Sequence, residues 1–573
     1  MTEFEARRTE VIEKAAAAAL RLPLQSSGLW FHGDMRDNLY FALHLYLASC
    51  REDIRLPGER GKARKLAEAM LLRLLRMQQR DPQTELYGHW PLALGSDPDN
   101  ARPHPLPVEL VGNLLSLFAI KYKSDLSETL KTELHTALSH VYRSRLYADG
   151  PAQFHHHDAK RCNLQLMLAV YFNDAELHET AVKNLDAIRS HVEANGFHEY
   201  GALPWFWHWI QAFTCSWEVS EDSEAKRIAG QTLAWLWDYR ARCYLKGAWI
   251  GPHSRVLPHD TPSDRNTLFD YVQFGDFGFP ADIARLEGAG LFSYRVSPEV
   301  MQLALDTEPT VWEAPLPPPP GQASAPLHQY IYRTGQFAVG GVLEYAEEYL
   351  NEQHRWDVTF PASADGAANQ AFFFHPGKGY EAGGARQASR HCEVLLHRTV
   401  VAALYPVPDG DDPTVVGFLP HGVWSISDKL WVGDIGSAYL AVHMRHKPAA
   451  RTSHLGMALT LPGRGNGVVL EVIGKQEAEE VLLRHRTQSA LHAGHAKPEL
   501  GEAAVYAGAG ETTDLLAALL ANRPPQFESG GGTVSVAYRS LAGDRLTLHV
   551  GQDGTVRRTL NDLDLSIAAN GRE

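Results

Sequence analysis

The sequence predicts an α+β protein with two domains, a helical N-terminal half followed by a C-terminal antiparallel β-sandwich. Three observations support this fold class. Hydrophobic residues recur at helical spacing up to about residue 300, a proline-rich run follows, and the remaining chain alternates with period two. With 573 residues, the chain exceeds what one hydrophobic core usually organises.

The helical half consists of apolar stripes separated by short breaks. Leu39, Ala42, Leu43 and Tyr46 form one such stripe, and residues 67–77 repeat the pattern. Helices joined by short Gly, Pro or Asp segments pack as antiparallel hairpins. We therefore expect a helical domain over residues 1–305.

The hydrophobic pattern changes from helical spacing to period two around four consecutive prolines, Pro317 to Pro320. Proline has no N–H and a fixed φ, so this run predicts an extended linker, which we place at residues 306–326. Short alternating runs such as 468–472 and 546–550 then predict a β-sandwich over residues 327–573.

The formal charge of −14 argues against non-specific nucleic-acid or anionic-membrane binding, because both need a dominant basic face. It permits an acidic substrate, because a few Arg and His residues set the local field of a cleft. The five cysteines are scattered and predict no disulfide framework. The N-terminus lacks the apolar core of a secretion signal, and no stretch reaches the length of a bilayer span, so we expect a cytoplasmic protein.

Two loop-like segments of the helical half suit a saccharide site. Residues 29–38 contain Trp30, and residues 87–91 contain His89 and Trp90. Aromatic faces cover the C–H surfaces of sugars while polar side chains bind the hydroxyls. The alternative is that both tryptophans cap the ends of helical hairpins.

A third segment contains His155, His156 and His157 and opens a helix that carries Asn163. Adjacent histidines do not share a helix face, so a metal site is disfavoured here. The Asn163 amide can donate to a substrate carboxylate, with Arg161 adding charge, and His157 is a substrate-binding candidate. Alternatively, Asn163 satisfies the backbone at the helix start.

Two further segments carry groups for proton transfer. In the fourth, a turn presents Glu199 as a substrate-binding candidate and Tyr200 as an acid or base if a nearby cation lowers its pKa. In the fifth, His253 and Arg255 lie two apart in an extended stretch and project to one side. The alternatives are a buried tyrosine with a bonded hydroxyl and ordinary surface His and Arg residues.

In their order along the chain, the segments YGHWP, RCNLQ, GFHEYGALPWF and GPHSR, followed by a β-rich half, resemble the heparinase- and alginate-lyase-like class of polysaccharide lyases. This resemblance implies that the helical half is an incomplete (α/α) toroid. It also implies that Asn163 neutralises a uronate carboxylate, that Tyr200 and His253 are the proton-transfer pair, and that Arg255 contacts a carboxylate. The chain departs from the better-known members because it lacks a clear Asn-His dipeptide, which leaves the base open between Tyr200 and His253.

Some members of this class hold a zinc ion in the sandwich through His and Asp. This chain offers candidates without a recognisable spacing, so we assign no metal and expect no cofactor; the candidates are His354, Asp357, His375, His391 and His397. A divalent metal in the sandwich stays open.

The resemblance and the site candidates together predict β-elimination in an acidic polysaccharide or oligosaccharide. Donors around the uronate carboxylate stabilise the charge that develops when the C5 proton leaves. One alternative is a glycoside hydrolase that uses Glu199 with Asp260 or Asp276. The other is a glycan-binding protein without catalysis. The sequence contains no dinucleotide or Walker motif, and it leaves the oligomeric state, including a homo-oligomer, open.

Overall fold

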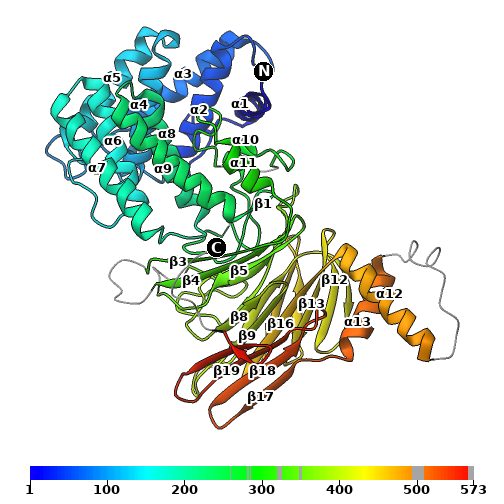
Figure 1. Ribbon diagram of the computed structural model, residues 1–573. Helices are drawn as coiled ribbons and strands as arrows, with labels where there is room; N and C mark the ends of the chain where they lie inside the picture. Colours follow the sequence, from blue (N-terminus) through cyan, green and yellow to red (C-terminus); the bar gives the residue numbers. More distant parts are fainter. Residues whose placement is uncertain are drawn as a thin grey trace. The chain divides into compact units, whose positions relative to one another are not determined.

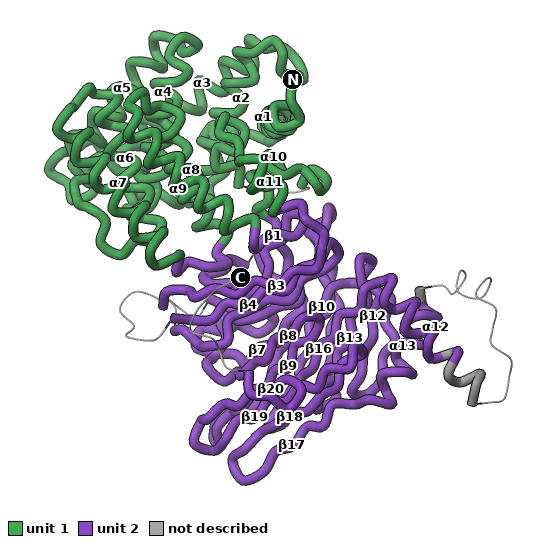
Figure 2. The backbone as a smooth tube through the Cα atoms, viewed as in Figure 1, with its two compact units in different colours: residues 1–196, 203–241, 266–303 green, residues 197–202, 242–265, 304–573 purple. Residues whose placement is uncertain are grey.

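The computed structural model describes residues 1–258, 260–280, 283, 285–318, 326–347, 352–492 and 509–565. It divides into two compact units (Figure 2). Unit 1 contains residues 1–196, 203–241 and 266–303, and unit 2 contains residues 197–202, 242–265 and 304–573. The predicted order of helices followed by antiparallel strands is confirmed (Figure 1).

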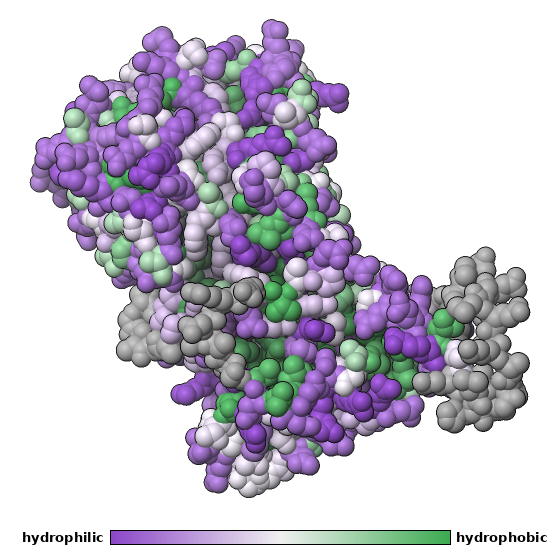
Figure 3. Space-filling view, in the orientation of Figure 1, coloured by the Kyte–Doolittle hydropathy of each residue, from purple (hydrophilic) through white to green (hydrophobic). Residues whose placement is uncertain are grey.

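Unit 1 contains two kinds of helix. Four helices, α2, α4, α6 and α8, are buried on almost every side, whereas α1, α3, α5 and α7 bury one stripe each. The buried helices contact one another, α4 with α6 and α8 and α6 with α8, and the one-sided helices pack around them. This double layer is the predicted incomplete (α/α) toroid, and its visible outer surface is largely hydrophilic (Figure 3).

The helices have the following bounds: α1 Glu3–Arg21, α2 Met35–Cys50, α3 Arg60–Arg76, α4 Pro107–Lys121, α5 Glu128–Ser144, α6 His156–Phe172, α7 Ala175–Asn195, α8 Leu203–Val219, α9 Ser223–Arg242, α10 Leu268–Gln273 and α11 Pro298–Leu305.

Unit 2 stacks three antiparallel sheets. The eight-stranded sheet has the order β14-β15-β10-β7-β6-β5-β4-β3, the six-stranded sheet β11-β12-β13-β16-β9-β8, and the five-stranded sheet β17-β18-β19-β20-β21. One apolar core joins the eight- and six-stranded sheets, and a second core joins the six- and five-stranded sheets. The six-stranded sheet is therefore a central layer, which explains why β9 and β16 are buried on both faces.

The strands are β1 Tyr244–Leu245, β2 Ala248–Trp249, β3 Thr310–Leu316, β4 Leu327–Arg333, β5 Ala338–Val342, β6 Trp356–Thr359, β7 Gln370–Phe374, β8 Glu393–His397, β9 Val400–Tyr405, β10 Val415–Leu419, β11 Val423–Ile426, β12 Leu430–Asp434, β13 Ala438–Met444, β14 Ala449–Thr452, β15 Met457–Leu461, β16 Asn466–Gly474, β17 Gln526–Gly530, β18 Thr533–Arg539, β19 Arg545–Val550, β20 Val556–Leu560 and β21 Leu563–Asp564. Two helices, α12 Lys475–His492 and α13 Ala509–Ala521, follow the sheet strand β16.

The structure differs from the predicted boundaries in two places. Residues 197–202 and 242–265, which we expected in the helical domain, belong to unit 2. The segment expected to be a linker contains β3, which pairs with β4. Strand β3 includes Pro315, and it lies at the edge of its sheet, where a missing N–H is tolerated. Pro319 and Pro320 lie outside the described residues.

Candidate functional site

Two predicted segments, about 50 residues apart in the chain, meet in unit 2. The Ser254 backbone N–H donates to the Tyr200 carbonyl at 3.1 Å. Gly201 has a φ of +64°, and a Cβ atom there would lie 1.9 Å from the Pro252 carbonyl oxygen. The structure therefore joins the segment of Tyr200 to the segment of His253 and Arg255.

Within this meeting point the side chains differ in exposure. Tyr200, Glu199 and His253 are buried, whereas 29% of the Arg255 side chain is exposed. Arg255 Nη1 lies 3.7 Å from Glu199 Oε1, and Arg255 has a left-handed φ of +46°. Such a φ is uncommon outside glycine and unfavourable for a residue with a Cβ atom.

His253 is the centre of a buried ionic cluster in unit 2. Its Nδ1 lies 3.3 Å from Asp357 Oδ2, and its Nε2 lies 3.5 Å from Asp264 Oδ1. His354 joins the cluster, with Nε2 3.4 Å from the same Asp357 oxygen. The backbones of His253 and His354 exchange two hydrogen bonds of 3.0 Å, which hold the two residues side by side.

The two histidines hold different charges. Burial lowers the pKa of His253, but hydrogen bonds to Asp264 and Asp357 outweigh this effect and raise its pKa to about 10. Burial lowers the pKa of His354 to about 4. At neutral pH without a metal, His253 is thus an imidazolium held by two carboxylates, and His354 is neutral.

Among the described residues, His253, His354 and Asp357 form the one group of three whose donor atoms lie close enough for a metal ion, within 4.8 Å of one another. Two imidazoles and a carboxylate are a donor set that zinc accepts. The other carboxylate oxygen, Asp357 Oδ1, accepts from Thr359 Oγ1 at 2.6 Å and from the Gly251 N–H at 3.1 Å, which orients the free oxygen. These residues fit a divalent cation.

The remaining sandwich candidates lie elsewhere. His375 binds Ser389 Oγ and the Asp412 carbonyl, both at 2.7 Å, His391 lies near Asp411, and His397 lies 3.2 Å from Asp544. Asp264 is a site residue that carries no motif signal of its own in the sequence. The spacing His354-x-x-Asp357 is the local signal that could have indicated this cluster.

A pocket of about 560 Å³ in unit 2 is lined in part by residues that follow Arg255 in the chain. Thr261, Pro262, Arg386, Arg451 and His454 contribute to its wall. The Arg386 guanidinium donates to the Val256 carbonyl at 3.0 Å, which connects this wall to the segment that carries Arg255.

In unit 1, the predicted sugar-binding side chains Trp30, His89 and Trp90 are buried. Trp90 is fully buried and donates from Nε1 to the Leu74 carbonyl at 3.0 Å. Trp30 packs edge-on to Phe41 and is 4% exposed, and His89 is also buried. These side chains pack in the helical core. Such burial is what the alternative, in which the tryptophans cap the ends of helical hairpins, leads one to expect.

Asn163 and His157 lie on α6. Asn163 is fully buried, and its amide donates to the Ala159 carbonyl at 2.7 Å, so the helix backbone already uses one of its donors. His157 is partly exposed and lies 2.8 Å from Glu109. The role of Asn163 toward a carboxylate stays a prediction.

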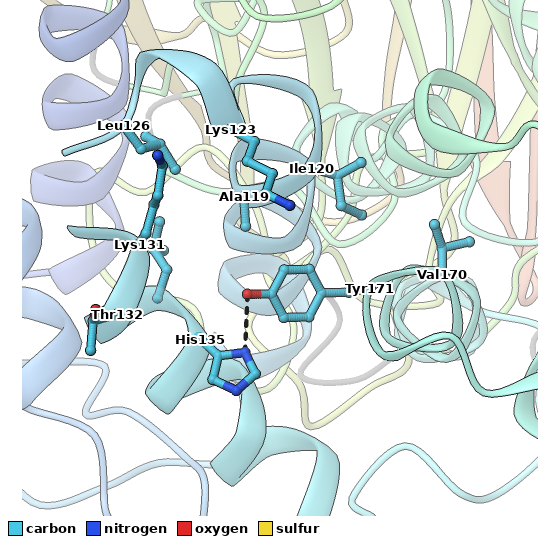
Figure 4. A pocket seen from close by; sticks show the side chains of 10 residues that line it. Ala119, Ile120, Lys123, Leu126, Lys131, Thr132, His135, Val170 and Tyr171 are labelled. Atoms are coloured by element: carbon cyan, nitrogen blue, oxygen red, sulfur yellow. Dashed lines mark hydrogen bonds between the residues drawn. The ribbon is translucent and has the colours of Figure 1, made fainter. Parts of the chain in front are cut away.

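Unit 1 also contains a pocket of about 590 Å³ between α4, α5 and α6 (Figure 4). His135 and Tyr171 face each other there at 3.3 Å, with Lys123 and Lys131 near them. The sequence-predicted site residues do not line this pocket. Within the described part of the chain, no helix is long and apolar enough to cross a membrane.

No protein-family model and no curated protein matches the chain. A chondroitinase AC lyase solved as oligosaccharide complexes is similar to it at 9% identity, with 97% of this chain and 93% of that chain covered and a TM-score of 0.42. The Streptomyces coelicolor A3 chondroitin AC lyase in complex with chondroitin sulphate is similar to it at 9% identity, with 97% of this chain and 91% of that chain covered and a TM-score of 0.43. A heparinase III is similar to it at 8% identity, with 90% of this chain and 83% of that chain covered and a TM-score of 0.36.

Proposed function

We propose that the chain cleaves a uronate-containing glycan by β-elimination and that unit 2 supplies the reacting groups. The meeting of residues 197–202 with residues 251–255 carries this proposal, because it ties a tyrosine to an arginine through the backbone. A phenol and a guanidinium are the two groups that the first step of the elimination needs.

In this step Arg255 faces the uronate carboxylate and stabilises the charge that develops as the C5 proton leaves. Tyr200 takes that proton. The C5–H electron pair forms the double bond between C4 and C5, the C4–O glycosidic bond breaks with its electron pair on the leaving oxygen, and that oxygen takes up the proton that Tyr200 now carries. Glu199 holds Arg255 in place through their ion pair.

The pocket bounded by Arg386 and Arg451 supports an acidic substrate. Arg386 pairs with Glu352 at 2.8 Å, whereas Arg451 lies on the exposed strand β14 and its side chain makes no hydrogen bond or ion pair to a described residue. We propose that Arg451 binds a further carboxylate or sulfate of the chain of sugars, since guanidinium groups match such anions in two-point contacts.

His253 serves this account as a positioning residue. Its Nδ1 bonds the Gly251 carbonyl at 2.9 Å, and both ring nitrogens lie within 3.5 Å of a buried carboxylate, so without a metal the charged ring is a poor proton donor at neutral pH. We propose that His253, His354 and Asp357 hold a divalent cation, which would fix the loop before Arg255 to the eight-stranded sheet. When bound, the cation supplies a structural cross-link.

A screen of uronate polymers and oligomers in the near ultraviolet tests the function. The expected result is a rising absorbance from an unsaturated uronate, and Arg255→Gln should lower kcat/KM while Arg539→Gln, an exposed arginine of β18, should not. Cleavage without absorbance would replace the elimination by hydrolysis with Glu199 and Asp260, both buried in unit 2. Binding without cleavage would leave a glycan-binding protein.

A further inference from the structure

A further pocket, of about 490 Å³, lies in unit 2 where three segments meet. They are the turn between β11 and β12, the end of β13, and the segment that joins α13 to β17. The Lys429 carbonyl accepts from the Met444 N–H at 2.8 Å, which fastens the first two segments to each other. The third contains Pro524 and Pro525, whose rings fix φ. The backbone around the pocket is therefore constrained before any ligand arrives.

The wall of this pocket carries positive charge without a negative group. Lys429 and Arg445 line it together with His443 and His446, and no Asp or Glu is among the described residues of the wall. The chain as a whole has the opposite sign, with a formal charge of −14. A concave surface with basic groups of one sign raises the local concentration of anions. The wall therefore selects for a negatively charged ligand.

The two cations of the wall are not neutralised by the described residues. Arg445 donates from Nη1 to the Gly465 carbonyl at 2.9 Å and from Nη2 to Ser529 Oγ at 2.6 Å, and both acceptors are uncharged. The Lys429 side chain makes no hydrogen bond or ion pair to a described residue. The guanidinium is thus held in one place while its charge stays available to a ligand.

His443 is the buried member of the wall, since it is 3% exposed. Its ring makes no hydrogen bond to a described residue, and of its two nitrogens only Nε2 is fully buried. Nδ1 is therefore the nitrogen that is open to the pocket. Burial lowers the pKa of His443 to about 4, so the ring is neutral and Nδ1 donates or accepts according to the tautomer. Buried polar side chains are nearly always paired, so an unpaired imidazole beside a pocket indicates that a ligand supplies the partner.

We infer that this pocket binds a phosphate monoester with an apolar organic part. Lysine and arginine both bind phosphate, and near neutral pH a phosphate monoester carries up to two negative charges, which match Lys429 and Arg445. The apolar side chains of Leu430, Met444 and Phe527 line the rest of the wall and would cover the organic part. The volume lies within the roughly 300–1,000 Å³ that small-molecule sites occupy. None of the groups that we propose for the elimination lines this pocket.

Calorimetric titration of the full chain with phenyl phosphate tests the inference. Three comparison ligands each lack one feature: phenol has no anion, inorganic phosphate has no apolar part, and phenyl sulfate carries a single charge. The wild type should bind phenyl phosphate at least about tenfold more tightly than each of them, because one hydrogen bond to a charged group is worth about that factor.

Two variants of the wall are compared with two matched controls. Lys429→Gln is paired with Lys447→Gln, an exposed lysine that lies outside the wall and pairs with Asp428 at 2.7 Å. Arg445→Gln is paired with Arg464→Gln, because Arg464 also donates to two uncharged acceptors, the carbonyls of residues 408 and 411, at 2.8 and 3.2 Å. Each control removes the same charge as its partner.

We expect Lys429→Gln and Arg445→Gln to weaken phenyl phosphate binding by at least about tenfold, while both controls stay within about twofold of the wild type. Lys429→Gln should also keep the melting temperature of the ligand-free chain, since that side chain bonds no described residue. The inference is overturned if the wild type does not bind phenyl phosphate, if any comparison ligand binds equally well, or if the controls lose as much affinity as the wall variants. A chain that binds phenyl phosphate but cleaves no glycan would remove the proposed lyase function and leave this site standing.

Discussion

The Tyr200 side chain is placed by its backbone, since the Tyr200 carbonyl accepts from the N–H of Ser254. A Tyr200→Phe variant keeps that bond and the packing of the ring and removes only the hydroxyl. If the phenol moves the C5 proton, turnover should fall by at least about 10²-fold with little change in the melting temperature. Tyr439→Phe, on strand β13, is the control and should retain full turnover. Near-normal turnover of Tyr200→Phe would exclude the phenol as the proton carrier.

Glu471 on strand β16 is a buried carboxyl between two sheets. It accepts from the Tyr538 hydroxyl at 2.6 Å and from the Leu541 N–H at 2.8 Å, yet burial raises its pKa to about 7. The folded state therefore binds this proton more tightly than the unfolded state, so stability is greatest at low pH and falls as pH rises from about 4.5 to about 7.

Glu471→Gln should remove this dependence. The free energy of unfolding of the wild type, relative to the variant, should drop by on the order of 3 kcal/mol between pH 4.5 and pH 7.5. Urea unfolding at both pH values measures it, and Glu528→Gln on the exposed strand β17 is the control. Parallel curves for wild type and Glu471→Gln would show that Glu471 does not titrate as described.

At the scale of single residues, the sequence indicates which chemical groups a site could use better than it indicates whether a side chain is buried in the core. It singled out Tyr200, His253 and Arg255, which the structure joins in one unit. It also singled out Trp90, whose side chain is in the core, since an aromatic next to a histidine looks the same in a core and in a cleft. Asp264 was missed because nothing local connects it to His253.

Among the elements, the turn at Gly201 decides whether the two site segments meet. Its left-handed φ and its close approach to Pro252 both exclude a side chain. Gly201→Ala should therefore abolish turnover and lower the melting temperature. Gly410→Ala is the matched control, because Gly410 has a φ of +105° with nothing within 4 Å of its Cβ position and tests backbone strain alone. Equal effects of the two changes on turnover would contradict the contact.

The helices and strands were predictable because their periodicities are local. The clean alternation of β18, buried at every second residue, is visible in its letters. The apolar run of β16 is not, because that strand is covered on both faces by neighbouring layers. The third sheet therefore cannot be counted from the sequence, and the proline in β3 favours a linker over a strand.

On the scale of the whole molecule, unit 2 is built from three separate stretches of chain. Residues 197–202 and 242–265 leave the helical unit and join the sheets. Periodicity reports where a helix is and not where the following loop packs, so a single boundary near residue 305 was the division that the sequence could support.

The proposed cation would connect two of these stretches, since His253 lies in one and His354 and Asp357 lie in another. We expect about one equivalent of a divalent metal per chain, lost in His354→Ala and retained in His397→Ala. Metal analysis by plasma mass spectrometry and melting with and without a chelator check this. Purified chain free of metal, with a melting temperature that metal and chelator both leave unchanged, would contradict the site.

The most direct test of the central claim is digestion of a uronate glycan in water enriched in heavy oxygen, followed by mass spectrometry of the products. Elimination breaks the C4–O bond without adding water, so the account predicts a new double bond and no heavy oxygen in either fragment beyond the slow exchange of the anomeric oxygen, which a sugar incubated without the protein measures. Hydrolysis adds one water across the bond. Products that carry one heavy oxygen and lack the double bond would contradict the account.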